Sequence, residues 1–374
     1  MRILQISNYY YPNVGGIEQT ARDLSLALKG ENEVRVFCFN RTRNNTSFEV
    51  DGVRVVKAGS FIKVSSQALS FSYGKLLKKE FESFDPEMVI FHYPNPFAAK
   101  YLLKMLKDRP SVKLVIYWHL DIYKQKILKM FFKGQNIKLL ERANKIIATS
   151  PNYIKGSKYL SAYGEKCAVI PSCVSDERIK ITDAVSKKCE KIRSDADGKT
   201  ILFAFGRHVK YKGLEYLIRA SKFLNDSFVI NIAGNGPLTL KLKKLAKDDK
   251  KVNFLGKLPD EDLVANLLSC DIFCFPSITK NEAFGLALAE AMRLGKPSVT
   301  FNIPDSGVNY VSLNGVTGIE VENKNSIQYA KAIKRIASDK ELCAKFGENA
   351  KARVEELFTF DKFCDNVKKV IKSV

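Results

Sequence analysis

The sequence predicts an α/β protein of two doubly wound domains, each with a parallel sheet covered by helices on both faces. Short apolar runs alternate along the chain with longer helical stretches, as is typical of parallel strands joined by helices. The alternation occurs in two series, which a polar stretch at 183–199 separates. The length of 374 residues also exceeds what one typical core needs. We therefore expect two domains and a ligand in the cleft between their facing sheets.

The first domain is predicted at 1–172. Its apolar, β-prone runs predict strands at 2–6, 34–39, 88–92, 114–118 and 145–149. Helices are expected between them at 18–29, 97–108 and 136–143.

The second domain is predicted at 173–358, and a C-terminal helix at about 359–374 is expected to pack back on the first domain. Strands are expected at 200–205, 228–233, 252–255, 271–275 and 297–301. Helices are expected at 213–224, 237–247, 260–269 and 285–294.

The composition predicts a folded cytoplasmic protein. Hydrophobic residues make up 45% of the chain, and no apolar run approaches the roughly 18 residues that span a bilayer. Residues 1–7 are too few and too polar for a signal peptide. Eight cysteines occur without a C-x-x-C pair, beside only three histidines. We therefore expect buried reduced thiols rather than disulfides or a metal site.

The net charge of +21 is unevenly spread, because residues 100–166 carry 15 lysines or arginines against 4 aspartates or glutamates. Such a surface suits nucleic acid, anionic lipid or a polyanionic substrate, and a lysine-rich proteome would also produce it. No nucleic-acid-binding signature accompanies it, so we expect an anionic membrane partner and no nucleic acid. Residues 122–133 are the candidate docking helix, since lysines and apolar residues fall on separate sides. The same spacing fits a helix packed on its own domain.

The segment 277–290, S-I-T-K-N-E-A-F-G-L-A-L-A-E, carries the strongest functional signal. It follows an apolar strand run and leads through a polar loop with Glu282 into a helix with Glu290. Unpaired N–H groups at a helix N-terminus attract phosphate, whereas carboxylates accept hydrogen bonds from the hydroxyls of a ribose or a hexose. The segment therefore predicts a nucleotide-sugar site. The alternative is an ordinary helix with an acidic first turn.

Two other segments suit phosphate at the ends of predicted strands. Gly15 and Gly16 would let the backbone approach a diphosphate or sugar closely, although such a pair is more often only a turn. Arg207 and Lys212 flank a short loop and would hold a pyrophosphate without metal. A solvated basic loop would have the same sequence.

Two more segments have a weaker signal. The turn at 233–237 includes Gly236, which fits either a binding loop or a plain turn. His119 follows a buried strand, and a lone histidine is more often structural than functional. Its position at a strand end favours a functional role.

Together these segments resemble the retaining glycosyltransferases of family 4, which have the GT-B architecture of two Rossmann-like domains. The resemblance runs through nearly the whole chain, and the stretches 92–96 and 118–126 are closer to the branch that builds bacterial O-antigen and surface polysaccharides, including mannosyltransferases. The matching motifs are Gly15-Gly16-x-Glu18, His119-x-Asp121, Ala148-Thr-Ser150, Val169-Ile-Pro171, Gly206-Arg207 with Lys212-Gly213, Gly234-x-Gly236-Pro237, and Glu282-x-Phe284-Gly285 through Glu290-Ala-Met292.

The resemblance implies transfer of a hexosyl group, mannosyl as the first choice, from a nucleoside-diphosphate sugar with retention of configuration. It implies no cofactor and no metal. The acceptor would be a polyprenyl-linked glycan, with the protein peripheral on the inner face of the cell membrane. The implied catalytic residues are Glu282, His119, Arg207 and Lys212, and the implied donor-binding residues are Gly15, Gly16, Arg207, Lys212, Gly236, Phe284, Gly285, Leu286 and Glu290.

The sequence departs from the family in two places. Residues 172–175, Ser-Cys-Val-Ser, stand where the family usually has Asn-Gly-Val-Asp, and residues 304–309 replace a glycine-rich loop. Three alternatives stay open: a nucleotide-sugar epimerase or hydrolase of the same fold, an inactive polysaccharide-assembly subunit, and a basic nucleic-acid-binding protein.

Overall fold

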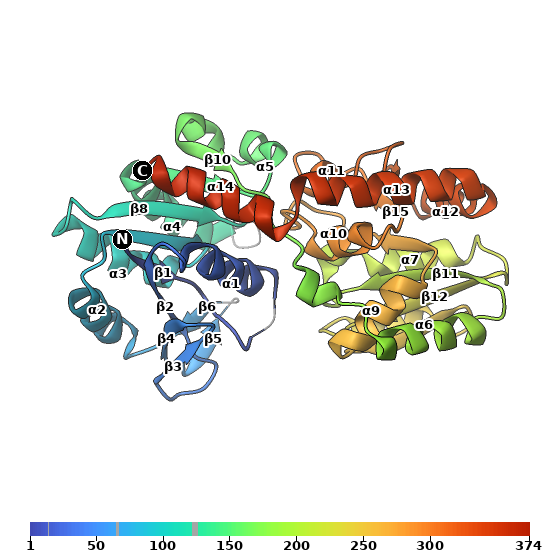
Figure 1. Cartoon of the computed structure of the whole chain (residues 1–374), viewed down its shortest axis with the longest axis horizontal. Helices are drawn as coiled ribbons and strands as arrows, with labels where there is room; N and C mark the ends of the chain where they lie inside the picture. Colours follow the sequence, from blue (N-terminus) through green and yellow to red (C-terminus); the bar gives the residue numbers. More distant parts are fainter. Residues whose placement is uncertain (14, 65–66, 122–125) are drawn as a thin grey trace. The chain divides into compact units, whose positions relative to one another are not determined.

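A computed structural model describes residues 1–13, 15–64, 67–121 and 126–374, with side chains described except at 64 and 126–131. The chain divides into two compact units (Figure 1). The first unit consists of Met1–Ser172 together with Phe360–Val374, and the second consists of Cys173–Thr359. Each unit is built on a largely parallel sheet with helices packed against it, so the predicted α/β fold class is confirmed.

The first unit has an eight-stranded sheet in the order β10-β9-β8-β7-β1-β2-β4-β3. Neighbouring strands pair in parallel except β3, which runs antiparallel to β4 at one edge. The two short strands β5 and β6 pair separately. The strands are β1 (Arg2–Ile6), β2 (Glu33–Phe39), β3 (Thr46–Val50), β4 (Val53–Ala58), β5 (Ile62–Val64), β6 (Gln67–Leu69), β7 (Met88–Tyr93), β8 (Lys113–Trp118), β9 (Lys145–Ala148) and β10 (Cys167–Val169).

The central strands of this sheet are apolar because helices cover both of its faces. All of β7 is buried, and β8 is buried from its second residue onward. At the start of α3, the side chain of Asn95 accepts a hydrogen bond from Ala98 N, and Pro96 occupies the first helical position. The helices are α1 (Gly16–Leu28), α2 (Tyr73–Phe84), α3 (Pro96–Lys107), α4 (Lys126–Arg142), α5 (Pro151–Gly156), the 3₁₀ helix η1 (Leu160–Lys166) and α14 (Phe360–Lys372).

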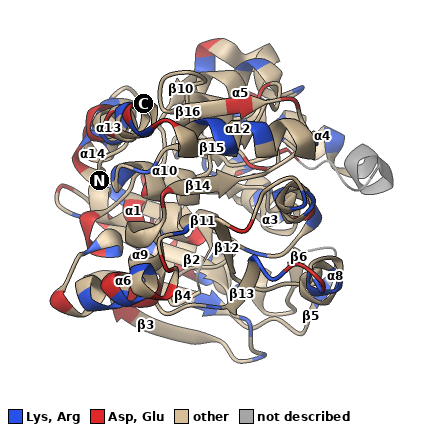
Figure 2. Ribbon diagram, turned by 90° about the vertical axis from the view of Figure 1, so that its right-hand side faces the viewer, with Lys and Arg blue, Asp and Glu red and all other residues tan. Residues whose placement is uncertain are grey.

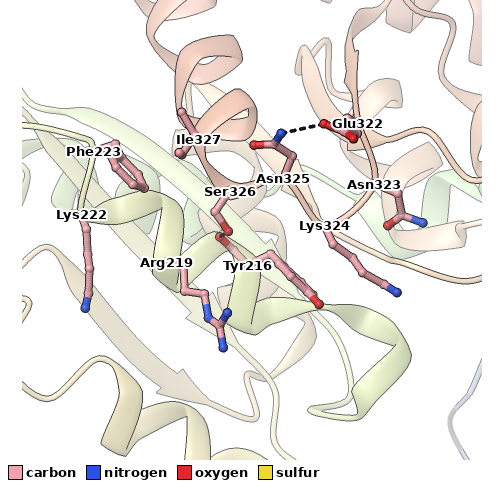
Figure 3. Close-up of a pocket in the computed structure, with 10 residues that line it drawn as sticks. All are labelled: Tyr216, Arg219, Lys222, Phe223, Glu322, Asn323, Lys324, Asn325, Ser326 and Ile327. Carbon is pink, nitrogen blue, oxygen red and sulfur yellow. Dashed lines mark hydrogen bonds between the residues drawn. The ribbon is translucent and has the colours of Figure 1, made fainter.

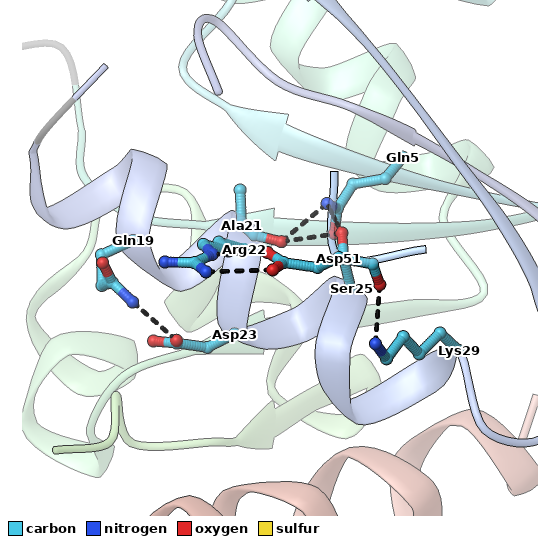
Figure 4. Close-up of polar contacts among 8 residues, drawn as sticks. All are labelled: Gln5, Gln19, Ala21, Arg22, Asp23, Ser25, Lys29 and Asp51. Atoms are coloured by element: carbon cyan, nitrogen blue, oxygen red, sulfur yellow. Dashed lines mark hydrogen bonds and ion pairs between the residues drawn. The ribbon is translucent and has the colours of Figure 1, made fainter. Parts of the chain in front are cut away.

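Helix α1 is held in place by buried and partly buried polar contacts (Figure 4). The Gln5 side chain of β1 donates to Ala21 O at 2.8 Å and to Ser25 Oγ at 2.9 Å. The guanidinium of Arg22 binds the Asp51 carboxylate at 2.7 and 3.1 Å. These contacts hold the glycine-bearing N-terminus of α1 at the carboxyl end of β1.

The second unit has a six-stranded, fully parallel sheet in the order β13-β12-β11-β14-β15-β16. In chain order this is 3-2-1-4-5-6, so the winding direction reverses between β11 and β14. The strands are β11 (Thr200–Phe205), β12 (Phe228–Ala233), β13 (Val252–Gly256), β14 (Ile272–Phe275), β15 (Ser298–Phe301) and β16 (Gly318–Val321). The helices are η2 (Asp176–Ile179), α6 (Asp183–Asp195), η3 (Lys210–Lys212), α7 (Leu214–Ser221), α8 (Thr239–Leu245), α9 (Asp260–Ser269), α10 (Leu286–Arg293), α11 (Val308–Val311), α12 (Ser326–Ser338) and α13 (Lys340–Leu357).

The polar stretch at 183–199, interpreted from the sequence as a separator between the two series, mostly forms helix α6 of the second unit. Thr182 caps this helix by accepting a hydrogen bond from Val185 N. The fully buried side chain of Val185 packs in a cluster with Val264 and Ala265 of α9. Lys188 adds ion pairs to the first turn of α9 at 2.7 and 3.1 Å. A few apolar residues on one face are therefore enough to hold an otherwise polar helix.

The C-terminal helix α14 belongs to the first unit and packs against α1. Phe363, Val367 and Ile371 lie buried along one side of α14, at the spacing of one helical face. Lys368 also forms an ion pair with Glu31 at 2.9 Å.

Basic and acidic residues are interspersed along the helices of both units (Figure 2). None of the described helices is long and apolar enough to cross a membrane.

All eight cysteines are free, and burial raises the pKa of Cys270 to about 12. Four of the thiols are buried, as expected from the sequence, and the other four are partly buried.

Candidate functional site

The strongest candidate site lies in the second unit, at the carboxyl ends of β11 and β14. These neighbouring strands flank the point where the winding of the sheet reverses, which is where open α/β sheets bind ligands. The loops that follow them touch, because Ile278 N donates to Tyr211 O at 2.9 Å. Gly213, at a φ of 61°, lies so close that an added Cβ would be 2.1 Å from Pro276 O.

The contact between the two loops brings Lys212 and Glu282 together. Lys212 Nζ lies 2.5 Å from Glu282 Oε2, and the two side chains are only 14% and 12% exposed. Ser277 Oγ donates to the same carboxylate oxygen at 3.1 Å. Burial lowers the pKa of Lys212, but the attraction of Glu282, with smaller contributions from Tyr211 and Glu290, outweighs it and raises that pKa. A charged lysine and a fixed carboxylate therefore lie in contact at a place largely excluded from solvent.

Arg207, the other predicted phosphate-binding cation, lies on the same loop but remains in solvent. Its side chain is exposed, and within the described part of the chain it forms no ion pair. Unlike Lys212, it can therefore move to an incoming anion without first leaving a carboxylate.

Glu290 lies inside α10, only 2% exposed, and pairs with a cation that the sequence did not indicate. Arg178 Nη2, from η2, lies 2.6 Å from Glu290 Oε1. The charge of Glu290 also helps to raise the pKa of Lys212, so the two predicted glutamates act on one lysine.

The N-terminus of α10 has the geometry of an anion site. Gly285 precedes the helix at a φ of 98°, a left-handed conformation that favours glycine. No side chain caps this helix in the structure described, so its first N–H groups point outward without a capping oxygen. Phe284 is 5% exposed and packs edge-on against Phe358 with ring centroids 5.3 Å apart. The aromatic ring anchors the loop, Gly285 is buried next to it, and Leu286 at the start of the helix is partly exposed.

The loop after β15 supports the Glu282 segment from behind. Ser306 Oγ donates to Glu282 O at 2.8 Å. Gly307 lies against Ala283, and an added Cβ would be 1.8 Å from its carbonyl oxygen. Asp305 takes a φ of 61°, a left-handed conformation that a glycine-rich loop would reach at lower cost. This loop, where the sequence departs from the family pattern, thus has a supporting role.

Replacing Gly307 with alanine is expected to destabilise the second unit by about 1–3 kcal/mol, the usual cost of overpacking. The new methyl group would overlap the Ala283 carbonyl, so the Glu282 loop would have to shift. Thermal unfolding measures this loss, and Gly30→Ala, where nothing lies within 4 Å of the added Cβ, is the control. An unchanged unfolding temperature for Gly307→Ala would show that the close contact is not maintained in solution.

The turn at Gly234 and Gly236 packs against the loop after β11. An added Cβ on Gly234 would lie 2.0 Å from Gly206 O, and one on Gly236 would lie 2.7 Å from His208 O. Close packing against backbone accounts for both glycines, and donor binding by Gly236 stays a prediction.

In the first unit, Gly15 and Gly16 form the start of α1, after β1. Gly15 is the residue before the helix, and an added Cβ there would lie 2.2 Å from Glu18 Oε2. Nothing lies within 4 Å of a Cβ on Gly16. Burial raises the pKa of Glu18, whose carboxyl group folds back over this helix start. An anion that approached Gly16 would have to share this position with Glu18.

His119 follows β8 in the first unit and is buried, with 6% exposure. Its Nε2 lies 2.8 Å from Nδ1 of His92, which belongs to β7. Asp121, the other residue of the motif, has a structural role here. Its carboxylate accepts hydrogen bonds from Trp118 Nε1 at 2.8 Å and from Ser157 Oγ at 2.9 Å.

The predicted docking helix at 122–133 overlaps the start of α4, but most of its side chains lie outside what the structure describes. Residues 122–125 are not described, and neither are the side chains at 126–131. The docking helix therefore stays a prediction.

A separate hollow of about 560 Å³ in the second unit contains none of the predicted site residues (Figure 3). It lies between α7 and the start of α12 and is lined by Tyr216, Arg219, Lys222, Phe223, Glu322, Asn323, Lys324, Asn325, Ser326 and Ile327. Its cations are surface side chains, and Glu322 is already bonded to Asn325 at 2.7 Å. The site at β11 and β14 has the functional groups that this hollow lacks.

Comparison with known families covers both units. A family model described as Glycosyltransferase Family 4 matches residues 14–178, and one described as Glycosyl transferases group 1 matches residues 186–353. The chain is a family 4 glycosyltransferase. The resemblance stated from its motifs is thereby confirmed.

Two similar proteins align with this glycosyltransferase over almost its whole length. The O-antigen chain mannosyltransferase C of Escherichia coli is 29% identical over 370 residues, which is 98% of this chain and 96% of that protein. A D-rhamnosyltransferase of Pseudomonas aeruginosa is 28% identical, covering 96% of this chain and 92% of its own.

Solved structures show the GT-B fold. The sucrose-phosphate synthase of Thermosynechococcus elongatus superimposes with a TM-score of 0.82 at 18% identity, covering 99% of this chain and 98% of that one. The Anabaena protein HepE, in complex with UDP and glucose, superimposes with a TM-score of 0.79 at 17% identity, covering 100% of this chain and 99% of that one.

In each unit the structure shows polar partners of predicted site residues that sequence reasoning missed. Ser277 and Ser306 hold the Glu282 loop, Arg178 pairs with Glu290, and His92 pairs with His119. Two of them had a signal in the sequence: His92 ends a predicted strand on the same sheet as His119, and Ser277 opens the segment 277–290. Ser306 lies in the loop after β15 and Arg178 lies in η2, and neither matches a motif.

Proposed function

We propose that this glycosyltransferase moves a hexosyl group, mannosyl as the first candidate, from a nucleoside-diphosphate sugar to a lipid-linked glycan during synthesis of cell-surface polysaccharide. The observation that carries the proposal is the Lys212–Glu282 pair at the winding reversal of the second unit. Beside it lie the uncapped start of α10 and the buried Glu290. Cations and amides suit a diphosphate, and carboxylates suit sugar hydroxyls, so this one place has groups for each part of a nucleotide sugar.

In the proposed mechanism, Arg207 and Lys212 bind the diphosphate and stabilise the charge that develops on it as the glycosidic bond breaks. Lys212 leaves Glu282 to do so, which frees the carboxylate to accept hydrogen bonds from the sugar ring. Glu290 accepts hydrogen bonds from the ribose hydroxyls. The amides at Phe284, Gly285 and Leu286 add the positive end of α10.

The first unit is proposed to contribute through its own motif residues. Gly15 and Gly16 would let the backbone approach the donor phosphate, and His119 would contact the sugar near its 6-position. The acceptor attacks from the face that the leaving phosphate occupies, and that phosphate takes up the acceptor proton, so the anomeric configuration is retained.

The names of the relatives support the donor and acceptor classes. A mannosyltransferase and a rhamnosyltransferase both move hexosyl groups, and the first is named for the O-antigen chain. HepE was solved with UDP and glucose, the two parts of a nucleotide sugar. A lipid-linked acceptor would bring the protein to an anionic membrane on the cytoplasmic side, which its charge of +21 favours. No nucleic-acid partner is proposed.

Excess EDTA is expected to leave turnover unchanged, because Arg207, Lys212 and the α10 amides supply the positive charge that a divalent ion would otherwise provide. Nucleotide release with and without the chelator measures this directly. Loss of activity in EDTA that Mg²⁺ or Mn²⁺ restores would contradict the metal-free mechanism.

The donor class is tested with a panel of GDP-mannose, UDP-glucose, UDP-galactose, UDP-N-acetylhexosamines and dTDP-rhamnose, each with and without a lipid-linked acceptor extract. We expect one donor to release nucleotide in an acceptor-dependent reaction. Equal release without acceptor would instead favour the hydrolase. Absence of release with every donor would favour the inactive subunit.

A further inference from the structure

His119 is held by a second histidine on the neighbouring strand. His92 Nδ1 lies 2.8 Å from His119 Nε2, and the two rings are within 12° of parallel. The Tyr117 ring lies nearly parallel to both, with its centroid 4.6 Å from that of His119 and 5.5 Å from that of His92. His92 is 1% exposed. The pair thus fixes the orientation of the His119 ring in a packed environment.

Both rings are neutral in this environment. Burial lowers the pKa of His92 to about 3, and burial followed by the proximity of His92 lowers the pKa of His119 well below its usual value. A neutral imidazole carries one N–H and one lone pair, so one ring donates and the other accepts. The pair uses Nε2 of His119, and Nδ1 is therefore the nitrogen left for a ligand.

The other ring nitrogen of His92, Nε2, indicates which of the two rings donates the hydrogen bond. His92 Nε2 is buried and has no hydrogen-bond partner among the described residues. If His119 donated to His92, the proton of His92 would lie on this buried Nε2 without an acceptor. Buried N–H groups without an acceptor are rarer in folded proteins than buried acceptors without a donor. The arrangement with the His92 proton on Nδ1 leaves only a lone pair unsatisfied.

We propose that His92 is a positioning residue: it donates its Nδ1–H to His119 Nε2, so that His119 presents Nδ1–H to a ligand oxygen as a neutral donor. The inference rests on the proposed function in one respect, namely that the ligand oxygen belongs to the transferred sugar. In this role His119 neither takes nor gives a proton. It orients the sugar, and His92 keeps it in the one tautomer that can do so.

The tautomers are read directly by long-range ¹H–¹⁵N correlation spectra of the full chain labelled with [¹⁵N]histidine, since the sequence has only three histidines. We expect both His92 and His119 to carry the proton on Nδ1 and to stay neutral at pH 7. A proton on Nε2 of His119, or a charged His119, would overturn the proposal whatever the activity.

Two variants of His92 test the effect on the reaction. His92→Phe keeps a ring but removes the donor, whereas His92→Asn places an amide N–H where Nδ1–H was. We expect His92→Phe to lose the Nδ1–H state of His119 and about tenfold or more in turnover, the scale for losing an orienting hydrogen bond to a functional histidine. His92→Asn should keep the tautomer and most of the turnover. Similar losses in both variants, with the His119 tautomer unchanged, would show that His92 acts only through packing and would overturn the proposal.

The test separates this inference from the proposed function. His119→Phe should lower turnover while leaving the affinity for the nucleoside diphosphate alone unchanged. If the predicted tautomers are observed but His119→Phe keeps full turnover, the role of His119 at the sugar is wrong, although the histidine pair exists.

Discussion

Lys212→Met is expected to lower turnover about 100-fold or more, the usual scale for losing one electrostatic donor to a developing charge. Methionine keeps an unbranched apolar side chain, one atom shorter, next to the Phe275 ring but removes the positive charge. Arg207→Ala should have a loss of the same order, because both cations are proposed to bind the leaving diphosphate. Initial rates at saturating donor measure both variants.

The matched control is Lys210→Ala. Lys210 is exposed and lies two residues from Lys212 in the same short helix, so the variant also removes one positive charge from this loop. It should keep near-normal turnover. Equal losses at Lys210 and Lys212 would mean that only the overall charge of the loop matters, and normal turnover for both Lys212→Met and Arg207→Ala would remove the loop from the mechanism.

The ion pair adds a second test of Lys212. In Lys212→Met the Glu282 carboxylate, at 12% exposure, loses its cationic partner and keeps the hydrogen bond from Ser277. The double variant Lys212→Met/Glu282→Gln removes both charges, so its thermal stability should recover relative to the single variant. Its turnover should not recover, because both groups are proposed to act on the donor.

The two glutamates are expected to differ in the kinetic constant that they affect. Glu290→Gln, which weakens the contact with the ribose, should raise the donor KM about tenfold or more with a smaller change in kcat. Glu282→Gln should lower kcat at saturating donor, because its contact with the sugar strengthens as the bond breaks. Full donor-saturation curves for both variants separate these effects.

Glutamine is chosen at both positions because it keeps the side-chain volume. Glu290 is nearly fully buried beside Arg178, so alanine would leave a cavity and an unpaired arginine and would confuse folding with binding. If both glutamine variants change only the donor KM, Glu282 takes no part in the chemical step. If both change only kcat, Glu290 is not at the ribose.

The sequence predicted the parallel sheets well because their strands are buried on both faces. Runs such as 88–92 and 228–233 are apolar except for His92 and Asn231, a pattern typical of strands covered on both faces, and they correspond to β7 and β12. The edge elements were missed for the opposite reason. Strand β3 is mostly exposed and contains Thr46, Ser47 and Glu49, so its sequence has no continuous apolar run.

The candidate site was predictable where a motif fixes the backbone. Glycines at 213 and 285 and the strand–loop–helix order indicated where Lys212, Glu282 and α10 would lie. The partners of these residues were not predictable, because pairs such as Arg178 with Glu290 join residues more than a hundred positions apart. Tertiary packing alone creates such contacts.

The most direct test of the account is a ¹H NMR spectrum of the reaction in EDTA with the active donor and a lipid-linked acceptor. For a donor with an α-linked sugar, such as GDP-mannose, we expect a new α-glycosidic anomeric signal that grows as the donor signal falls. Growth of the free-sugar signals alone would show hydrolysis, an altered sugar still attached to the nucleotide would show epimerisation, and a β-glycosidic signal would contradict retention.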